Sequence, residues 1–173
     1  MQINILKHQT KNSYEWTNTL LKSIPAGLWE ETPGVIESNV SWQVGHLILS
    51  TYYHSINVIA GHQRDVLEKI PMKRYAALYT NAEPGKAKGS VEPETLLSQL
   101  LFIQNRSVET ISTLPDNDLK NELEPTRMKH PIAKTKFEAI DWNIKHTMWH
   151  CGQISILKRI VHERFDFGFP KNN

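Results

Sequence analysis

The chain has 173 residues, enough to bury one hydrophobic core, and its 20 basic and 18 acidic side chains leave a formal net charge of only +2. The charges are scattered, and the longest basic group, residues 69–74, is interrupted by Pro71. We therefore expect no nucleic-acid-binding surface. Cys151 is the only cysteine, which excludes an intramolecular disulfide and a cysteine-rich metal site and is typical of a reducing compartment. With no signal-peptide run and no stretch of eighteen apolar residues, we expect a cytoplasmic protein that does not cross a membrane.

Two helices are predicted in the first third of the chain. Residues 4–24 contain no glycine or proline, and an apolar residue recurs every four positions from Trp16 onward. The second helix is predicted over residues 42–62, with Ser41 as its N-cap. This second helix is apolar on most sides. We therefore expect it to be covered on more than one face, either by the bundle or by a second subunit.

A row of polar residues is predicted along the second helix. Spacings of four, seven and eleven residues return to nearly the same angle, so they place four side chains on one line: His46, Ser50, Tyr53 and Asn57. His54 lies about 80° away from this line. We expect the His54 side chain to pack against a neighbour or to face solvent.

The middle of the chain alternates loops with one clear helix. Residues 64–91 are predicted to form a long connection with one short helical turn, and such connections often cap functional sites. A third helix is predicted from Pro93 to Leu114, and residues 115–134 form another loop. No run of alternating β-branched residues predicts a substantial sheet. The predicted fold is therefore all-α, a four-helix bundle with long connecting loops in a single domain over residues 1–173.

The last predicted helix spans residues 135–164 and carries the strongest local signals. Thr135 and Glu138 have the spacing of a capping box, in which each side chain accepts a hydrogen bond from the other residue's backbone N–H. No proline interrupts the helix, and a polar stripe that includes Asp141 runs along one side of it.

Two histidines lie on the apolar side of this last helix. His146 and His150 are one turn apart, with roughly 6 Å of rise, and Gln153 adds a third polar group to the same line. A buried imidazole needs a partner, because an unsatisfied polar group costs about 1–3 kcal/mol. His46 is a natural third member, and three imidazoles around a divalent cation leave open coordination positions, as in catalytic sites. The alternative is a set of core histidines satisfied by backbone carbonyls or tyrosine hydroxyls.

Two segments carry a resemblance to a known family. Residues 41–47, which end in His46-Leu47, and the motif His146-x-x-x-His150-x-x-Gln153 resemble the DinB-like superfamily of four-helix-bundle proteins. That superfamily includes bacillithiol S-transferases and, more distantly, mycothiol-dependent enzymes, and the resemblance spans nearly the whole chain. It implies a divalent metal, usually zinc or nickel, held by His46, His146 and His150 near one end of the bundle, and often a homodimer.

The resemblance has one departure that bears on the reaction. Many relatives carry an acidic residue directly after the first histidine of the pair, where this chain has Thr147. Hydrolysis of the H-E-x-x-H type needs that carboxylate as a general base, so peptidase-like hydrolysis is disfavoured. A metal-bound thiol, in contrast, ionises readily. We therefore predict a metal-dependent enzyme that activates a thiol or water, similar to a thiol S-transferase, with a low-molecular-weight thiol as candidate cosubstrate.

The predicted substrate is a small molecule, and three polar residues are predicted to shape its pocket: Tyr53, Asn57 and Gln153. A metal-dependent hydrolase and a non-catalytic bundle that binds metal or dimerises remain as alternatives. Cys151, Trp142 and Trp149 are expected to fill the core. The other histidines support no particular role: His8, His62, His130 and His162.

Overall fold

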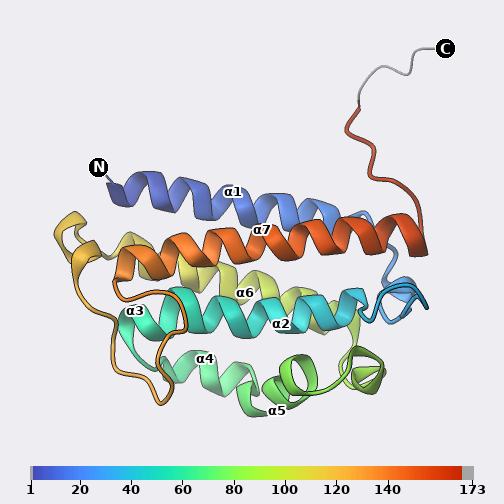
Figure 1. Ribbon diagram of the computed structural model, residues 1–173, viewed down its shortest axis with the longest axis horizontal. Helices are drawn as coiled ribbons and strands as arrows, with labels where there is room; N and C mark the ends of the chain where they lie inside the picture. The colour runs from blue at the N-terminus through green and yellow to red at the C-terminus, as the bar shows by residue number, and fades with distance from the viewer. Residues whose placement is uncertain (1, 169–173) are drawn as a thin grey trace.

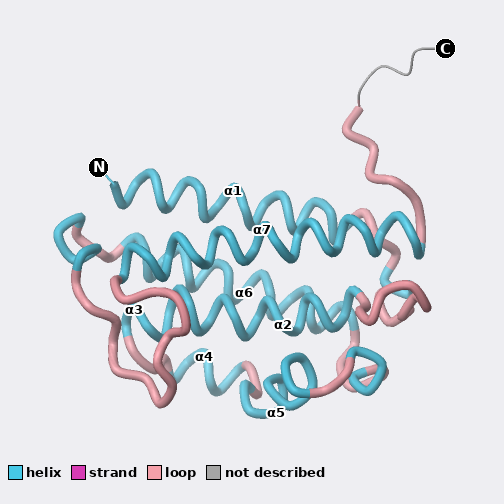
Figure 2. Tube along the Cα trace, viewed as in Figure 1, coloured by secondary structure: helices cyan, strands magenta, loops and turns pink. Residues whose placement is uncertain are grey.

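The structure is a computed structural model that describes residues 2–168, and in this range it is all-α, as predicted. Four long helices run side by side as a bundle (Figures 1 and 2): α1 (Gln2–Lys22), α2 (Val40–Tyr52), α6 (Pro93–Ser112) and α7 (Lys136–Val161). Helix α1 packs against α7 and α6, and α2 packs against α6 and α7. Within residues 2–168 the extended backbone is limited to an isolated bridge between Glu122 and Thr135. None of the described helices is long and apolar enough to span a membrane.

The connection between α2 and α6 holds more helix than the sequence predicted. Shorter elements occupy this and the other connections: η1 (Ala26–Leu28), η2 (Tyr53–Asn57), α3 (Val58–Ala60), α4 (Arg64–Lys69), α5 (Met72–Ala76), η3 (Ala77–Asn81), η4 (Pro84–Ala87) and η5 (Asp116–Lys120). The prediction of one short turn in residues 64–91 is therefore wrong. Pro71 and Pro84 divide the segment into pieces too short to show a helical period, and buried side chains such as Tyr75 and Tyr79 hold those pieces against the bundle.

The second predicted helix differs from the observed one at both ends. Its N-cap is Asn39, whose side-chain oxygen accepts a hydrogen bond from Trp42 N at 2.8 Å, so Ser41 lies inside the helix and its predicted role is wrong. Beyond Tyr52 the helix widens into the π-helical segment η2, then continues as α3 and ends at Gly61, which has φ of 75°. Segments of π-helix shift the angular register, so the predicted polar row does not continue through η2. Instead, His54 comes to the side that faces α7.

Helix α7 begins as predicted and ends earlier. The capping box is present, since Glu138 N donates to Thr135 Oγ1 at 3.3 Å and Thr135 N donates to Glu138 Oε2 at 3.0 Å. The helix ends at Val161, where the buried Lys158 ammonium donates to Glu163 O at 3.0 Å. A lysine that hydrogen-bonds a carbonyl after its own last turn is a common way to end a helix.

Two groups of buried apolar side chains fill the bundle. The larger one joins the four long helices to α5 and η3 through Tyr75 and Tyr79. The smaller one packs Leu119 and Ala133, from the loop that precedes α7, against Val58 and Ile59 of α3. The second group therefore holds this loop against the end of the second helix.

Candidate metal centre

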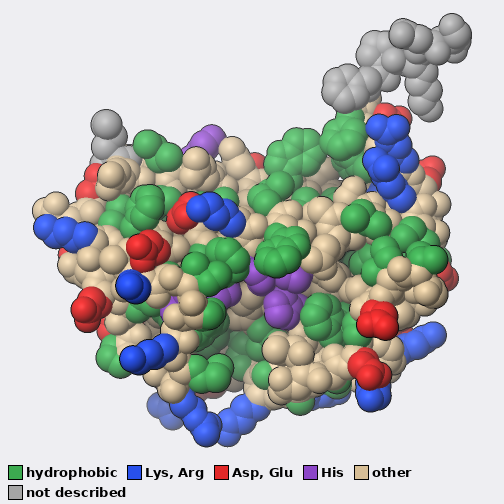
Figure 3. All heavy atoms as spheres, viewed as in Figure 1, with side chains coloured by type: hydrophobic (Ala, Val, Ile, Leu, Met, Phe, Trp, Pro, Cys, Tyr) green, Lys and Arg blue, Asp and Glu red, His purple; other side chains and the backbone are tan. Residues whose placement is uncertain are grey.

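Three imidazoles meet between α2 and α7. His46 lies on α2, His146 and His150 lie one turn apart on α7, and one ring nitrogen from each falls within 4.8 Å of the other two. The Nε2 atoms of His146 and His150 are 3.2 Å apart. Figure 3 shows histidine side chains near the middle of one face of the molecule, with hydrophobic side chains around them. The structure thus brings together the three residues that the sequence predicted as ligands.

Hydrogen bonds fix the orientation of two of these rings. His46 Nδ1 lies 2.9 Å from the backbone oxygen of Tyr79, and His150 Nδ1 lies 2.5 Å from Oε1 of Gln43. A carbonyl oxygen only accepts, so each Nδ1 carries the hydrogen and each Nε2 is left with a lone pair. This is the tautomer of a metal-binding histidine whose outer nitrogen is held by a second partner.

The buried Gln43 side chain links both arms of the site. It is 1% exposed, and its Nε2 donates to Ser38 Oγ at 2.7 Å and to Gln153 Oε1 at 2.8 Å, which directs Oε1 toward His150. Sequence reasoning missed Gln43, although it lies within the motif that carried the family resemblance. A glutamine three residues before His46 in an otherwise apolar helix is the signal that could have found it.

The close approach of Tyr79 to α2 positions His46 and depends on a glycine. A Cβ atom on Gly45 would lie 2.2 Å from Tyr79 Cγ, so only glycine allows the fully buried ring to rest on the helix backbone. The indole of Trp42 stacks on the His46 ring at a centroid distance of 5.2 Å and an interplanar angle of 7°. His46 is therefore held from one side by a carbonyl and from another by an aromatic ring.

Burial keeps all three imidazoles neutral. It lowers the pKa of His46, and it is the largest cause that lowers the pKa of His146 to about 4 and that of His150 to about 3. Repulsion between the rings in their charged forms lowers the last two pKa values further. At neutral pH the three rings therefore offer lone pairs rather than positive charges.

This donor set fits a divalent cation. Ligand nitrogens at 2.0–2.1 Å from one tetrahedral zinc ion are about 3.3 Å apart, close to the 3.2 Å between His146 Nε2 and His150 Nε2. Closing the whole set around one ion requires a small side-chain rotation, because its widest separation is 4.8 Å. Neutral imidazoles are ligands for zinc, copper, iron and nickel.

A second histidine pair adjoins the three. His54 Nδ1 lies 2.7 Å from His130 Nε2, and the His54 ring centroid is 5.4 Å from that of His146. The His54 side chain is 8% exposed, and burial is the largest cause that lowers its pKa to about 2. Sequence reasoning gave His130 no role and expected His54 only to pack or to face solvent. The loop position of His130 offered no periodic signal.

Comparison with known proteins places the chain in a family. The sequence model of the DinB superfamily matches residues 9–154, most of the chain. The chain belongs to the DinB superfamily. No curated protein sequence matches this DinB-superfamily chain. A solved structure, the colibactin self-resistance protein ClbS in complex with a dsDNA, superposes with a TM-score of 0.60 at 17% sequence identity and covers 91% of this chain and 95% of its own.

The expectation that excluded nucleic acid is wrong as an inference from overall charge. ClbS, which shares the fold, was crystallised in complex with a dsDNA. The earlier inference used the net charge of +2 and the scatter of charged residues along the chain. Contacts with phosphates need only a local surface, which neither quantity describes.

The three predicted pocket residues of this DinB-superfamily chain lie at different distances from the histidines. Gln153 reaches His150 through Gln43. Tyr53 stacks on His130 at 5.5 Å and donates its hydroxyl to Met128 O at 3.0 Å, so it contacts the second histidine pair. Asn57 is buried at 7% exposure, and no described contact joins its side chain to the three imidazoles.

The expected core residues fall into two groups. The Trp142 ring lies 5.8 Å from His146 and 6.5 Å from His54, beside the site. The prediction that Trp149 fills the core is wrong, because its side chain is 62% exposed, with its ring 6.5 Å from that of His146. Cys151 is half-buried against the larger core group, and burial raises the pKa of its thiol.

Proposed function

We propose that this DinB-superfamily chain is a metal-dependent enzyme that activates a thiol or water for attack on a small electrophilic substrate. In this proposal His46, His146 and His150 hold zinc or nickel. A divalent cation bound there would lower the pKa of a thiol or water that it binds. The observation that carries the proposal is the convergence of three neutral imidazoles, two of which have Nδ1 hydrogen-bonded to a carbonyl oxygen.

The surroundings of the three imidazoles favour thiol transfer over hydrolysis. Thr147, which follows His146, is 2% exposed and carries no carboxylate. The nearest acid on α7, Asp141, is 2.5 Å from Lys145 Nζ and forms an ion pair with it. A hydrolase needs a positioned base to take a proton from water. A thiol with a lowered pKa needs no such base, so a low-molecular-weight thiol is the favoured cosubstrate.

Aromatic side chains near the three imidazoles favour a small apolar electrophile. The rings of Trp42 and Trp149 contact His46 and His146, and Trp149 is largely exposed. Ligand sites combine such apolar walls with a few polar groups that fix orientation. Gln153, which adjoins Gln43, is the predicted pocket residue with the shortest hydrogen-bonded path to a proposed ligand.

The first test is metal content. Elemental analysis of tag-free protein should find about one zinc or nickel ion per chain, and the His146→Ala variant should lose it. His8→Ala is the matched control, because His8 is an exposed α1 histidine that contacts Asn12. Equal metal content in wild type and His146→Ala, or none in either after reconstitution, would overturn the proposed centre.

The second test is turnover. Wild-type protein loaded with zinc or nickel should transfer low-molecular-weight thiols to a panel of small electrophiles, and His150→Ala should reduce the rate to background. Loss of turnover on chelation with folding retained would agree with an enzyme. Unfolding on chelation without turnover under any condition would favour the alternative of a non-catalytic metal-binding bundle.

Duplex DNA is a second candidate ligand, because the fold is shared with ClbS and one loop next to the histidines is basic. Residues 127–134 contain Arg127, Lys129 and Lys134, all exposed, and no acidic residue. In a fluorescence anisotropy titration with a duplex of about 20 base pairs, neutralising Arg127 and Lys129 with glutamine should weaken binding and lower the salt slope by nearly one per lost phosphate contact. The control replaces Lys69 and Lys73, and equal losses in both variants would contradict a site at this loop.

A further inference from the structure

The loop that carries His130 is anchored against the end of the second helix. The Nζ atom of Lys136, a residue that is 9% exposed, donates to Ile59 O at 2.7 Å and to Glu124 Oε1 at 2.8 Å. Glu124 N in turn donates to Val58 O at 2.9 Å. These three hydrogen bonds join the loop, α3 and α7, so the position of His130 relative to the metal centre is set by backbone contacts.

The hydrogen bonds of His130 determine which of its nitrogens carries the hydrogen. His130 Nδ1 accepts from Ala133 N at 2.8 Å and lies 3.2 Å from Ile132 N. A backbone N–H can only donate, so Nδ1 holds the lone pair. In the neutral ring the hydrogen is therefore on Nε2, and the ring of Tyr53 stacks on His130 in a nearly parallel arrangement at 5.5 Å.

The tautomer of His130 determines that of His54. The only partner for His130 Nε2–H among the described residues is His54 Nδ1, at 2.7 Å. His54 Nδ1 must therefore accept, and the hydrogen of the neutral His54 ring must be on Nε2. That Nε2–H has no hydrogen-bond partner in residues 2–168, and its ring lies 5.4 Å from the ring of His146.

The two sets of imidazoles are thus complementary. His46 and His150 present Nε2 lone pairs to the proposed centre, whereas His54 presents an Nε2–H at its edge. An atom that binds a cation and also accepts a hydrogen bond would satisfy both sets. Anions and groups with two lone pairs, such as a thiolate, a carboxylate or azide, have this property.

We propose that His130 fixes the tautomer of His54, and that His54 Nε2–H is a recognition group that donates a hydrogen bond to an anionic ligand at the three-histidine site. This inference rests on the proposed metal centre for its second half only. The first half concerns the protein alone and holds with or without a cation. His130 is a positioning residue, and His54 is the residue that contacts the ligand.

The tautomers can be measured directly. Long-range proton–nitrogen correlation spectra of metal-free protein labelled with ¹⁵N-histidine should show both rings neutral with the hydrogen on Nε2, and His54→Phe and His130→Ala assign the signals. In His130→Ala the His54 ring should become a mixture of tautomers, whereas the exposed control His8→Ala should leave it unchanged. A His54 ring with hydrogen on Nδ1 in the wild type would overturn the inference.

The ligand contact is tested on cobalt(II)-loaded protein, because cobalt gives visible absorption bands that report ligand exchange. His54→Phe keeps a ring and removes the donor, so azide affinity should fall roughly tenfold while cobalt affinity stays within about threefold. His54→Gln, which restores an N–H donor, should recover part of that loss, and His130→Ala should weaken azide less than His54→Phe does.

Azide affinity that is equal in wild type and His54→Phe would overturn the proposed ligand contact. A wild-type protein that binds no cobalt would overturn the metal centre, and with it the second half of the inference. The tautomer spectra would still decide the first half. The failure of the proposed function and the failure of the His130–His54 inference are therefore distinguishable.

Discussion

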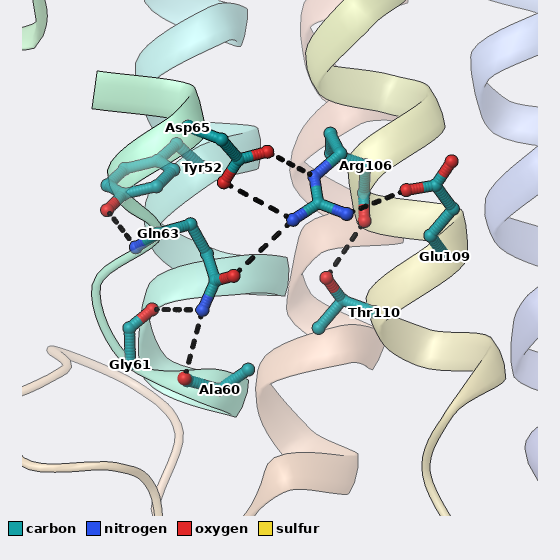
Figure 4. Close-up of polar contacts among 8 residues, drawn as sticks. All are labelled: Tyr52, Ala60, Gly61, Gln63, Asp65, Arg106, Glu109 and Thr110. Atoms are coloured by element: carbon teal, nitrogen blue, oxygen red, sulfur yellow. Dashed lines mark hydrogen bonds and ion pairs between the residues drawn. The ribbon is translucent and has the colours of Figure 1, made fainter. Parts of the chain in front are cut away.

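The guanidinium of Arg106 and the imidazole of His146 each lie in a polar cluster between helices, and the clusters differ in what surrounds them. Around Arg106 on α6 the partners are complementary (Figure 4). Arg106 Nε is 3.2 Å from Asp65 Oδ2, and Nη1 donates to Glu109 Oε2 at 2.8 Å. Gln63 extends the cluster by donating to the carbonyls at the end of α3. Donors and acceptors match without a further partner.

Around His146 the partners are of one kind. The imidazoles of His46 and His150 face it with lone pairs, and burial disfavours a positive charge on any of the three rings. Opposite charges that meet, as at Arg106, staple α4 to α6. Lone pairs that converge without an acid or a cation leave a site that a ligand would complete, which is why we assign structure to the first cluster and function to the second.

Gly45→Ala should have the largest effect and should damage only the histidine cluster. The new methyl group would overlap Tyr79 Cγ, which a fully buried ring cannot avoid without moving. Overpacking of this kind costs about 1–3 kcal/mol, and we expect the upper end in the free energy of unfolding measured with urea. Displacing the Tyr79 carbonyl should also weaken zinc binding, since this oxygen holds His46.

Gly152→Ala is the matched control for that substitution. Gly152 also lies within a helix, but a Cβ atom there meets nothing within 4 Å. This variant should gain about 0.4–1 kcal/mol from the lower chain entropy of the unfolded state. If both variants lose similar stability, the Tyr79 contact does not set the cost at Gly45.

Zinc should stabilise the protein through the histidine cluster and not through the Arg106 cluster. At a free zinc concentration 100 times the dissociation constant, binding to the folded state alone adds about 2.7 kcal/mol, or roughly 5–10 °C in Tm for a chain of this size. His150→Ala should lose this increment, and Arg106→Met should keep it in full. Calorimetric scans with and without zinc measure both, and an equal increment in His150→Ala would contradict the proposed ligand set.

The comparison also separates what the sequence predicts from what it does not. The four long helices were predictable because each has a period of apolar residues and clear end signals, such as Pro93 at the start of α6 and the Thr135 capping box of α7. The short helices between α2 and α6 were not, because tertiary contacts hold them. The rings of Tyr75 and Tyr79, 5.2 Å apart, pack these pieces against the larger core group.

The candidate site was predictable only in its first layer. The spacing of His146 and His150 places them on one face of a helix, and the family resemblance added His46 as a ligand. Gln43 was missed because a glutamine in a helix looks the same in the sequence whether it is buried or exposed. His130 was missed because it is 76 residues from His54 and lies in a loop, where only the folded chain brings the two together.

Acid should destabilise the metal-free protein through the histidine cluster. Burial holds the pKa of His54 at about 2, below its unfolded value near 6.5, so on acidification the unfolded state binds a proton that the folded state refuses. The stabilisation is complete above about pH 6.5 and is lost as pH falls toward the folded value. At pH 5.5 the loss is about 1 kcal/mol for each such histidine.

Urea unfolding at pH 7.5 and 5.5, with a chelator present, tests this acid sensitivity. The fall in the free energy of unfolding should be smaller by about 1 kcal/mol in His54→Phe than in the wild type. His8→Phe, on the exposed side of α1, should leave the fall unchanged. An identical fall in His54→Phe would mean that the unfolded and folded states protonate this residue alike.

Arg106→Met should have the smallest effect. The Arg106 side chain is 28% exposed, and its partners Asp65 and Glu109 are 53% and 60% exposed, so solvent screens both ion pairs. Pairs of this kind contribute about 0–1 kcal/mol, and methionine keeps most of the apolar stem that packs between α4 and α6. The loss should shrink in 1 M salt, where screening acts over roughly 3 Å. A large, salt-independent loss would mean that the Arg106 cluster is a buried charge network, and the contrast with the histidine cluster would then rest on ligand binding alone.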